Sequence, residues 1–231
     1  MSLGLRVYVR AFLAILLPAM IWGTWRHFRY ELIAKNFAVV EPNFLYRSGQ
    51  LSARLVQRTL QKNDIQLVVA LLDYDKRKAE HRAQRQAVAA LGIEQINLHL
   101  RGNGTGDIRH YAEAIAAIAR AKREQKHVLV HCAAGARRTG GVIATYLALV
   151  ENMPSETAYR ELDRYGGHSV AESALLPYLN ANMETLAQLL VEKGVIPRVP
   201  DPLPQFQPPS LTRTESGAGI HAAHTEPFSR R

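Results

Sequence analysis

The only cysteine of the chain lies in a segment whose residue types suit nucleophilic chemistry on an anion. Cys132 follows the apolar run and histidine VLVH and precedes AAGARRTG, residues 133–140. A short glycine-containing loop between a strand and a helix can turn successive backbone N–H groups inward, and the helix dipole adds positive potential there. Such donors, with a nearby arginine, lower the pKa of a cysteine and favour its reactive thiolate. The segment therefore predicts a thiolate nucleophile at the base of an anion-binding loop.

The residues after the cysteine have the properties that a phosphate group requires. Gly135 permits a backbone conformation that other residues resist, and the guanidinium fork of Arg138 can hold two phosphate oxygens. Arg137 is balanced between a solvent-exposed position and a substrate contact. Thr139 can hydrogen-bond the sulfur, and His131 is expected to orient the loop. The predicted binding residues are Ala133, Ala134, Gly135, Ala136, Arg137 and Arg138.

This segment resembles the signature of the cysteine-dependent protein tyrosine phosphatases, HCxxGxxR followed by Ser or Thr, and it matches every fixed position. Residues 46–50, YRSGQ, are similar to the YRS-x-Q segment of the bacterial and fungal dual-specificity-like branch. The resemblance covers about residues 36–195. It implies a phosphocysteine intermediate at Cys132, transition-state binding by Arg138, and neither metal nor cofactor. It also implies that Arg47 lies beside the active-site loop and supports it.

A general acid must protonate the departing oxygen, and the family places an aspartate on a loop upstream of the cysteine. Asp107 is the only carboxylate between Glu94 and Glu113, and it lies in the loop RGNGTGD, residues 101–107. We expect it to act as the acid. The competing interpretation is that Asp107 caps the helix that follows. His99 and His110 are alternative acids.

The order of apolar and polar segments predicts an α/β fold with a central, mainly parallel sheet flanked by helices. The continuous apolar run at 65–72 is typical of a strand buried on both faces, 93–100 predicts a second strand, and 127–131 a third, buried one. Amphipathic or alanine-rich segments at 76–91, 108–124, 139–151, 154–165 and 171–193 predict the helices. Strands that alternate with helical crossovers favour a phosphatase-like layered domain.

The first 30 residues predict a membrane anchor. Residues 11–25 carry no charge and are flanked by arginines, which is typical of an uncleaved signal anchor or transmembrane segment. On this basis we expect a protein of the bacterial inner membrane with a periplasmic catalytic domain, or alternatively one that faces the cytoplasm.

The distribution of charge and of proline along the chain indicates which partners to expect. Four of the nine excess positive charges lie in residues 1–30, so the central region carries no strongly basic face and nucleic acid is not an expected partner. Seven of the eleven prolines lie in residues 197–231, which predicts a disordered tail. We expect a monomer that hydrolyses phosphotyrosine, and phosphoserine or phosphothreonine, on proteins or small phosphomonoesters. The alternatives are an inositol phosphate or phosphoinositide phosphatase and a phosphate-binding pseudophosphatase without activity.

Overall fold

The computed structural model describes residues 3–166 and 173–208, and these form a five-stranded sheet with helices on both faces. The strands are β1 (Ala38–Glu41), β2 (Leu45–Ser48), β3 (Ile65–Ala70), β4 (Glu94–Asn97) and β5 (His127–His131). The helices are α1 (Leu3–Leu32), α2 (Val56–Lys62), α3 (Ala79–Leu91), α4 (Ile108–Arg123), α5 (Arg137–Leu149), α6 (Ser155–Gly166) and α7 (Leu175–Glu192). The predicted α/β class is confirmed.

The sheet is mainly parallel, as predicted. Its strand order is β1-β2-β5-β3-β4, in which only the β1–β2 pair is antiparallel. Parallel strands end at the same edge of a sheet, where α/β proteins place their ligands. The carboxyl ends of β2, β3, β4 and β5 therefore meet around Cys132, which follows the central strand β5.

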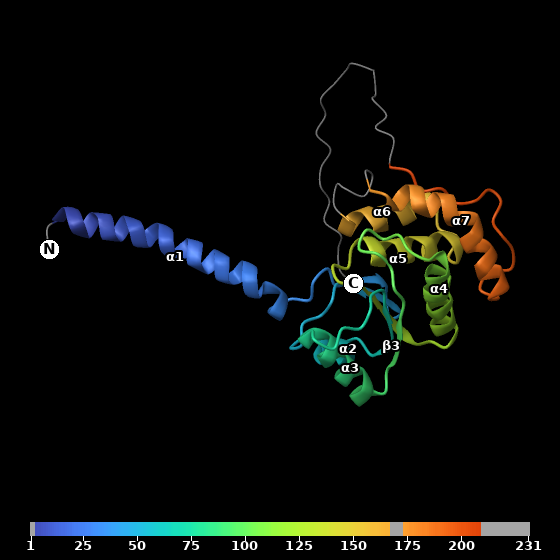
Figure 1. Cartoon of the computed structure of the whole chain (residues 1–231), viewed down its shortest axis with the longest axis horizontal. Coiled ribbons are helices and arrows are strands. Elements are labelled where there is room, and N and C mark those ends of the chain that lie inside the picture. Colours follow the sequence, from blue (N-terminus) through green and yellow to red (C-terminus); the bar gives the residue numbers. More distant parts are fainter. Residues whose placement is uncertain (1–2, 167–172, 209–231) are drawn as a thin grey trace, which may run out of the picture.

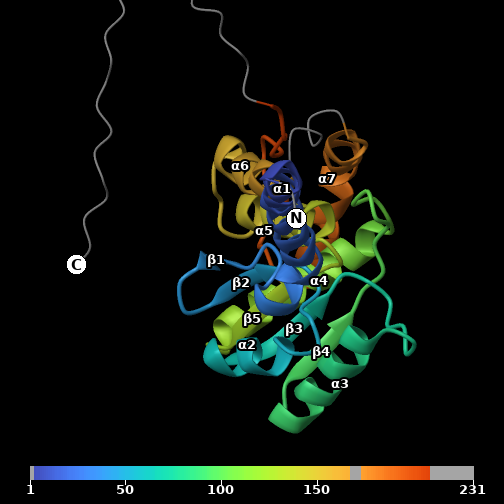
Figure 2. The same cartoon turned by 90° about the vertical axis from the view of Figure 1, so that its left-hand side faces the viewer.

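Two hydrophobic cores, one on each face, hold the sheet between its helices. Alternate residues of β5 serve both: Val128 and Val130 pack with α4, α5, α6 and α7, whereas Leu129 packs with α2 and α3. Figures 1 and 2 show the larger helical layer on one side of the sheet and α2 and α3 on the other. Because β5 is buried on both faces, the residue that follows it has a fixed position.

The N-terminal segment is helical, but the predicted membrane anchor is wrong. In the described residues no helix combines the length and the apolar character needed to cross a bilayer. Residues 11–25 without charge rise only about 22 Å as a helix, short of the roughly 30 Å of bilayer hydrocarbon, and arginines flank them. The predicted inner-membrane location, with either orientation, is therefore also wrong. Figure 1 shows α1 extending away from the sheet and its helices.

The proline-rich tail differs from expectation over its first part. Residues 197–208 run along the domain, and the Phe206 side chain is 1% exposed within the larger core. The Asn180 side chain on α7 donates to the Phe206 carbonyl and accepts from its N–H, both at 2.9 Å. Prolines restrict this segment without preventing it from packing. The remaining predicted tail, residues 209–231, lies outside the described residues.

Candidate active site

The loop between β5 and α5 forms a cup with its carbonyl groups turned outward. The Ala133 carbonyl accepts from the Gln50 N–H at 3.2 Å, and the Ala134 carbonyl accepts from the Asn36 side chain at 2.9 Å. The Gly135 carbonyl accepts from Arg47 Nη2 at 2.8 Å. In a trans peptide the N–H points opposite the carbonyl. The N–H groups of residues 134–136 are therefore directed away from these partners, toward the cup.

Gly135 lets the loop approach β2 closely. Its φ is 69°, in the left-handed region that glycine adopts without strain. A β-carbon at this position would collide with the backbone of Ser48 and Gly49. The glycine thus serves both the turn of the loop and its contact with the YRSGQ segment, which the resemblance placed beside the loop.

Cys132 lies at the base of the cup, 1% exposed, and its Sγ accepts from the Gly135 N–H at 3.2 Å. Burial raises the pKa of its thiol. The Thr139 hydroxyl, the charge of Arg138 and the N–H groups of Thr139 and Gly135 act in the opposite direction and outweigh burial. The net result is a pKa below the ordinary cysteine value, which favours the thiolate.

Arg138 lies half-buried in the first turn of α5, close enough for its charge to lower the pKa of Cys132. Its Nη1 donates to the Leu71 carbonyl at 3.1 Å and lies 3.5 Å from the Leu100 carbonyl. These carbonyls follow β3 and β4, so two neighbouring strand ends orient the guanidinium. Of the remaining predicted binding residues, Ala133 is exposed, whereas Ala134, Ala136 and Arg137 are half-buried.

Arg47 joins the loop to α6. The side chain is fully buried on β2, and Nη1 donates to Glu161 Oε1 at 2.5 Å while Nη2 donates to the Gly135 carbonyl. Its guanidinium lies 3.9 Å from the centroid of the Tyr165 ring. Burial lowers the pKa of Arg47, and Glu161 opposes that effect. The sequence pointed to Arg47 but carried no signal for Glu161, which lies 114 residues further along the chain.

His131 faces the opposite side of the sheet, toward α3. Its Nε2 lies 2.9 Å from Nε2 of Gln84, and the ring is 1% exposed. Burial lowers the pKa of His131 to about 4, so the ring is neutral near pH 7. The sequence carries no signal for Gln84, because a glutamine in a polar helix belongs to no distinctive pattern.

Asp107 begins α4 and caps it: its Oδ1 accepts from the Arg109 N–H at 2.9 Å. The carboxylate is exposed at the end of the 101–107 loop. Two tyrosines hold this loop, because Tyr111 Oη donates to the Gly104 carbonyl at 2.6 Å and Tyr178 Oη donates to the Gly106 carbonyl at 2.9 Å. The predicted helix cap is therefore present, and because it uses Oδ1, Oδ2 of Asp107 is available to carry a proton.

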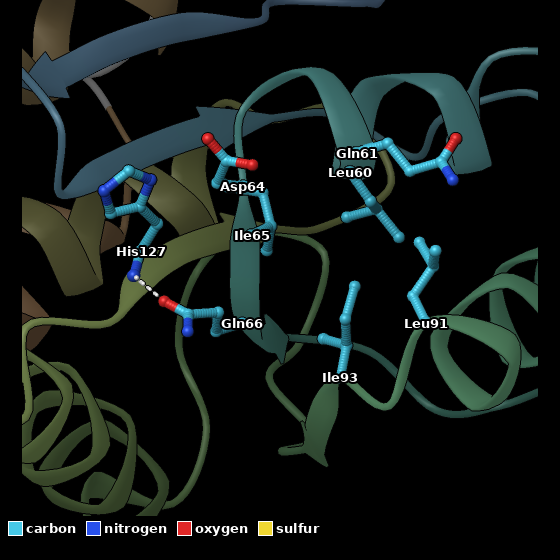
Figure 3. A pocket seen from close by; sticks show the side chains of 8 residues that line it. All are labelled: Leu60, Gln61, Asp64, Ile65, Gln66, Leu91, Ile93 and His127. Atoms are coloured by element: carbon cyan, nitrogen blue, oxygen red, sulfur yellow. Dashed lines mark hydrogen bonds between the residues drawn. The ribbon is translucent and has the colours of Figure 1, made fainter.

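The two alternative acids form contacts of their own. His99 Nδ1 pairs with Asp73 Oδ2 at 2.7 Å on the surface, and His110 Nδ1 lies 2.8 Å from the His99 carbonyl. A separate hollow, drawn in Figure 3, lies between α2, α3 and the starts of β3 and β5. It includes Ile65 and His127, at the amino ends of the strands, so it is at the opposite edge of the sheet from Cys132.

A low-pKa cysteine under an N–H-lined loop, with an arginine in the next helical turn, defines the class of cysteine-dependent phosphatases. The chain belongs to the dual specificity phosphatase family, whose catalytic domain matches residues 45–192. No curated protein sequence matches the chain significantly.

Solved structures share the fold. TpbA of P. aeruginosa is 22% identical with a TM-score of 0.52, over 71% of this chain and 99% of TpbA. A mutant form of Tk-PTP is 20% identical with a TM-score of 0.51, over 69% of this chain and 97% of its own. The catalytic core of Siw14 is 15% identical with a TM-score of 0.56, over 72% of this chain and 96% of its own. These likenesses concern the fold.

Proposed function

We propose that the protein hydrolyses phosphomonoesters through a phosphocysteine intermediate at Cys132. The observation that carries the proposal is the loop itself, whose carbonyls are held outward by Gln50, Asn36 and Arg47 while a low-pKa sulfur lies at its base. An N–H-lined cup is complementary to the equatorial oxygens of a phosphoryl group in transfer. Arg138, in the first turn of α5, adds a charged donor that can bind two phosphate oxygens.

The reaction takes place in two steps. The Cys132 thiolate attacks phosphorus, an S–P bond forms, and the bond to the leaving oxygen breaks as protonated Asp107 donates its proton to that oxygen. Water then attacks the phosphocysteine while the Asp107 carboxylate accepts its proton. The S–P bond breaks, and inorganic phosphate and the thiolate are released. Asp107 must therefore be protonated before the first step, which leaves it ionised, and the second step protonates it again.

We propose proteins bearing phosphotyrosine as substrates, with phosphoserine and phosphothreonine also accepted. The support is the short 101–107 loop and the exposure of Ala133 on the cup, which favour a shallow approach to the sulfur. Short phosphorylated side chains can reach the sulfur of a shallow cup. Polyphosphorylated inositols need several cationic side chains to bind their extra phosphates. Residues 133–137 of this loop include three alanines and only one cation, Arg137, so we rank these substrates second.

The full-length chain tests the proposal with p-nitrophenyl phosphate in the presence of a metal chelator. We expect hydrolysis that vanadate inhibits and that Cys132→Ser abolishes, because serine at this position lacks the acidity of the thiol. Rapid quenching of the wild-type chain with a labelled substrate should trap phosphate on Cys132. Hydrolysis that survives Cys132→Ser in a folded variant would refute the mechanism.

A further inference from the structure

A row of amide side chains leads from the end of β3 to His131. Asn97 Nδ2 donates to the Leu72 carbonyl at 3.3 Å, and Asn97 Oδ1 accepts from Gln95 Nε2 at 2.9 Å. Gln95 Oε1 accepts from Gln84 Nε2 at 3.2 Å. Gln84 Nε2 also lies 2.9 Å from His131 Nε2. Each amide is therefore linked to the next, from the strand end to the imidazole.

The direction of the row follows from its first member. A backbone carbonyl accepts hydrogen bonds and cannot donate them, so Asn97 must turn its NH₂ group toward Leu72. Its oxygen then faces Gln95, which fixes the orientation of Gln95 and, through it, that of Gln84. Gln50 supports the same orientation, because its Nε2 donates to Gln84 Oε1 at 2.8 Å. The NH₂ group of Gln84 is left as a donor to the imidazole.

A donor at Nε2 decides which nitrogen of a neutral imidazole carries the proton. His131 Nε2 must accept, so the proton lies on Nδ1. Nδ1 is buried and has no hydrogen-bond partner among the described residues. The Cys132 backbone lies close enough to favour a charge on this ring. The proton is therefore held on the side of the nucleophile.

We infer that Gln84 is a positioning residue, which fixes His131 as the neutral tautomer with its proton on Nδ1, next to the backbone of Cys132. The inference rests on the proposed function, since it concerns the loop that would carry the reaction. It separates this site from a cysteine–imidazolium ion pair, because the thiolate is stabilised here by neutral donors and Arg138.

The surroundings of His131 agree with a neutral ring. His81 on α3 and Arg138 on α5 both disfavour the imidazolium, and burial acts in the same direction. The residues opposite His131 on the neighbouring strands are Ser48 and Ala70, neither of which is charged. Arg47, one residue before Ser48, is paired with Glu161 on the other face of the sheet. Within the described part of the chain, no carboxylate is among the groups that act on the ring.

The test reads the tautomer directly in the full-length chain labelled with ¹⁵N-histidine. The His131 signals are assigned by their loss in His131→Asn. We expect the long-range ¹H–¹⁵N pattern of a neutral Nδ1–H imidazole from pH 5.5 to 8. Gln84→Leu should give a mixture of tautomers, and Gln84→Glu should protonate both nitrogens. Gln188→Leu, on the exposed face of α7, is the matched control and should leave the pattern unchanged.

Kinetics provide a second readout. We expect Gln84→Leu to lower kcat by about ten-fold, the effect of losing one hydrogen bond of ordinary strength, with KM unchanged. Gln84→Glu should move the acidic limb of kcat/KM to lower pH, because an imidazolium stabilises the thiolate.

Two results would overturn the inference: an Nε2–H tautomer in the wild-type chain, or an unaltered His131 pattern in folded Gln84→Leu. The wild-type spectrum tests the tautomer even if a variant does not fold. An inactive wild-type enzyme with the expected tautomer would contradict the proposed function and leave this inference intact.

Discussion

At the scale of single residues, Asp107 has two roles to reconcile. Its Oδ1 caps α4, and the proposed reaction requires a proton on the same carboxyl group. Asparagine and serine are good N-caps that cannot supply a proton, so substitutions can separate the two roles without removing the cap.

We expect Asp107→Asn and Asp107→Ser to slow hydrolysis of alkyl phosphates by roughly 10²–10⁴-fold, and that of p-nitrophenyl phosphate much less. The reason is that p-nitrophenolate leaves without protonation. The measurement is kcat/KM across phosphate esters of rising leaving-group pKa, with urea unfolding to confirm that the cap is retained. Equal losses for every ester would assign Asp107 to the cap alone.

Arg47 makes two contacts that substitutions can separate: the ion pair with Glu161 and the hydrogen bond to the Gly135 carbonyl. Arg47→Met should destabilise the fold by about 3–5 kcal/mol, because Glu161 loses its partner in a buried setting. The double variant Arg47→Met/Glu161→Leu should recover most of that stability, because apolar pairs replace buried ion pairs well. Its kcat should stay low, since the Gly135 carbonyl still lacks its donor. Urea unfolding and kcat for both variants test this, and full recovery of kcat would show that the loop needs no such support.

His131 makes stability depend on pH. Its pKa is about 4 in the folded chain, against about 6.5 in an unfolded one. Between these values the unfolded chain binds more protons, so stability falls as the pH drops from 7 toward 4. The loss attributable to this residue approaches about 3 kcal/mol. Urea midpoints at pH 7 and 4.5 should differ more for wild type than for His131→Gln. The same pH sensitivity in both chains would disprove the assignment.

At the scale of elements, the 101–107 loop is tied down by α4 and α7. Tyr111 and Tyr178 donate to successive parts of its backbone, so the carboxylate of Asp107 is held by helices that pack in the core. A loop held in this way would present the proposed acid, Asp107, without a closing motion.

We expect Tyr111→Phe to cost about 1–3 kcal/mol of stability, because the buried Gly104 carbonyl loses its donor. Adding Tyr178→Phe should lower kcat for alkyl phosphates more than for p-nitrophenyl phosphate, as the acid loses its fixed position. Urea unfolding and the ratio of the two kcat values measure these effects. Tyr159→Phe, on α6, is the control and should leave the ratio at its wild-type value.

The sequence predicted the elements that carry periodic or compact patterns. The buried strands and the loop after β5 follow from apolar runs and from a spaced motif, so the places of Cys132 after β5 and Arg138 at the start of α5 were predicted without coordinates. Gln84 and Glu161 were not, because their contacts join elements far apart in sequence. Local composition does not predict which polar side chain hydrogen-bonds to which distant loop or strand.

The predictions for the N-terminal segment and for the first part of the tail, residues 197–208, were wrong for a different reason. Composition suggested an anchor in residues 1–30 and disorder from residue 197. Membrane spanning depends on continuous apolar length, which the flanking arginines interrupt. Residues 197–208 pack because the Phe206 side chain is buried in the larger core, and the proline content of the segment does not predict that contact.

At the scale of the whole molecule, residues 195–208 complete the larger core. Phe206 and Ile196 are buried in it beyond the end of α7. We expect Phe206→Ala to destabilise the full-length chain by about 3–5 kcal/mol, the usual cost of removing a buried aromatic ring. Phe12→Ala on exposed α1 is the control, and its urea midpoint should match that of wild type. An unchanged midpoint for Phe206→Ala would show that the domain ends before this segment.

The chain has two tryptophans, and both lie on α1, where Trp22 is 64% and Trp25 is 50% exposed. The sheet and its surrounding helices contain tyrosine but no tryptophan. Indole emission therefore reports the surroundings of α1, whereas tyrosine emission comes mainly from the domain that carries Cys132, where seven of the nine tyrosines lie. Two optical signals thus separate events along one chain. A partner that covers α1 would shift the indole spectrum to the blue while catalysis and the tyrosine signal stay unchanged.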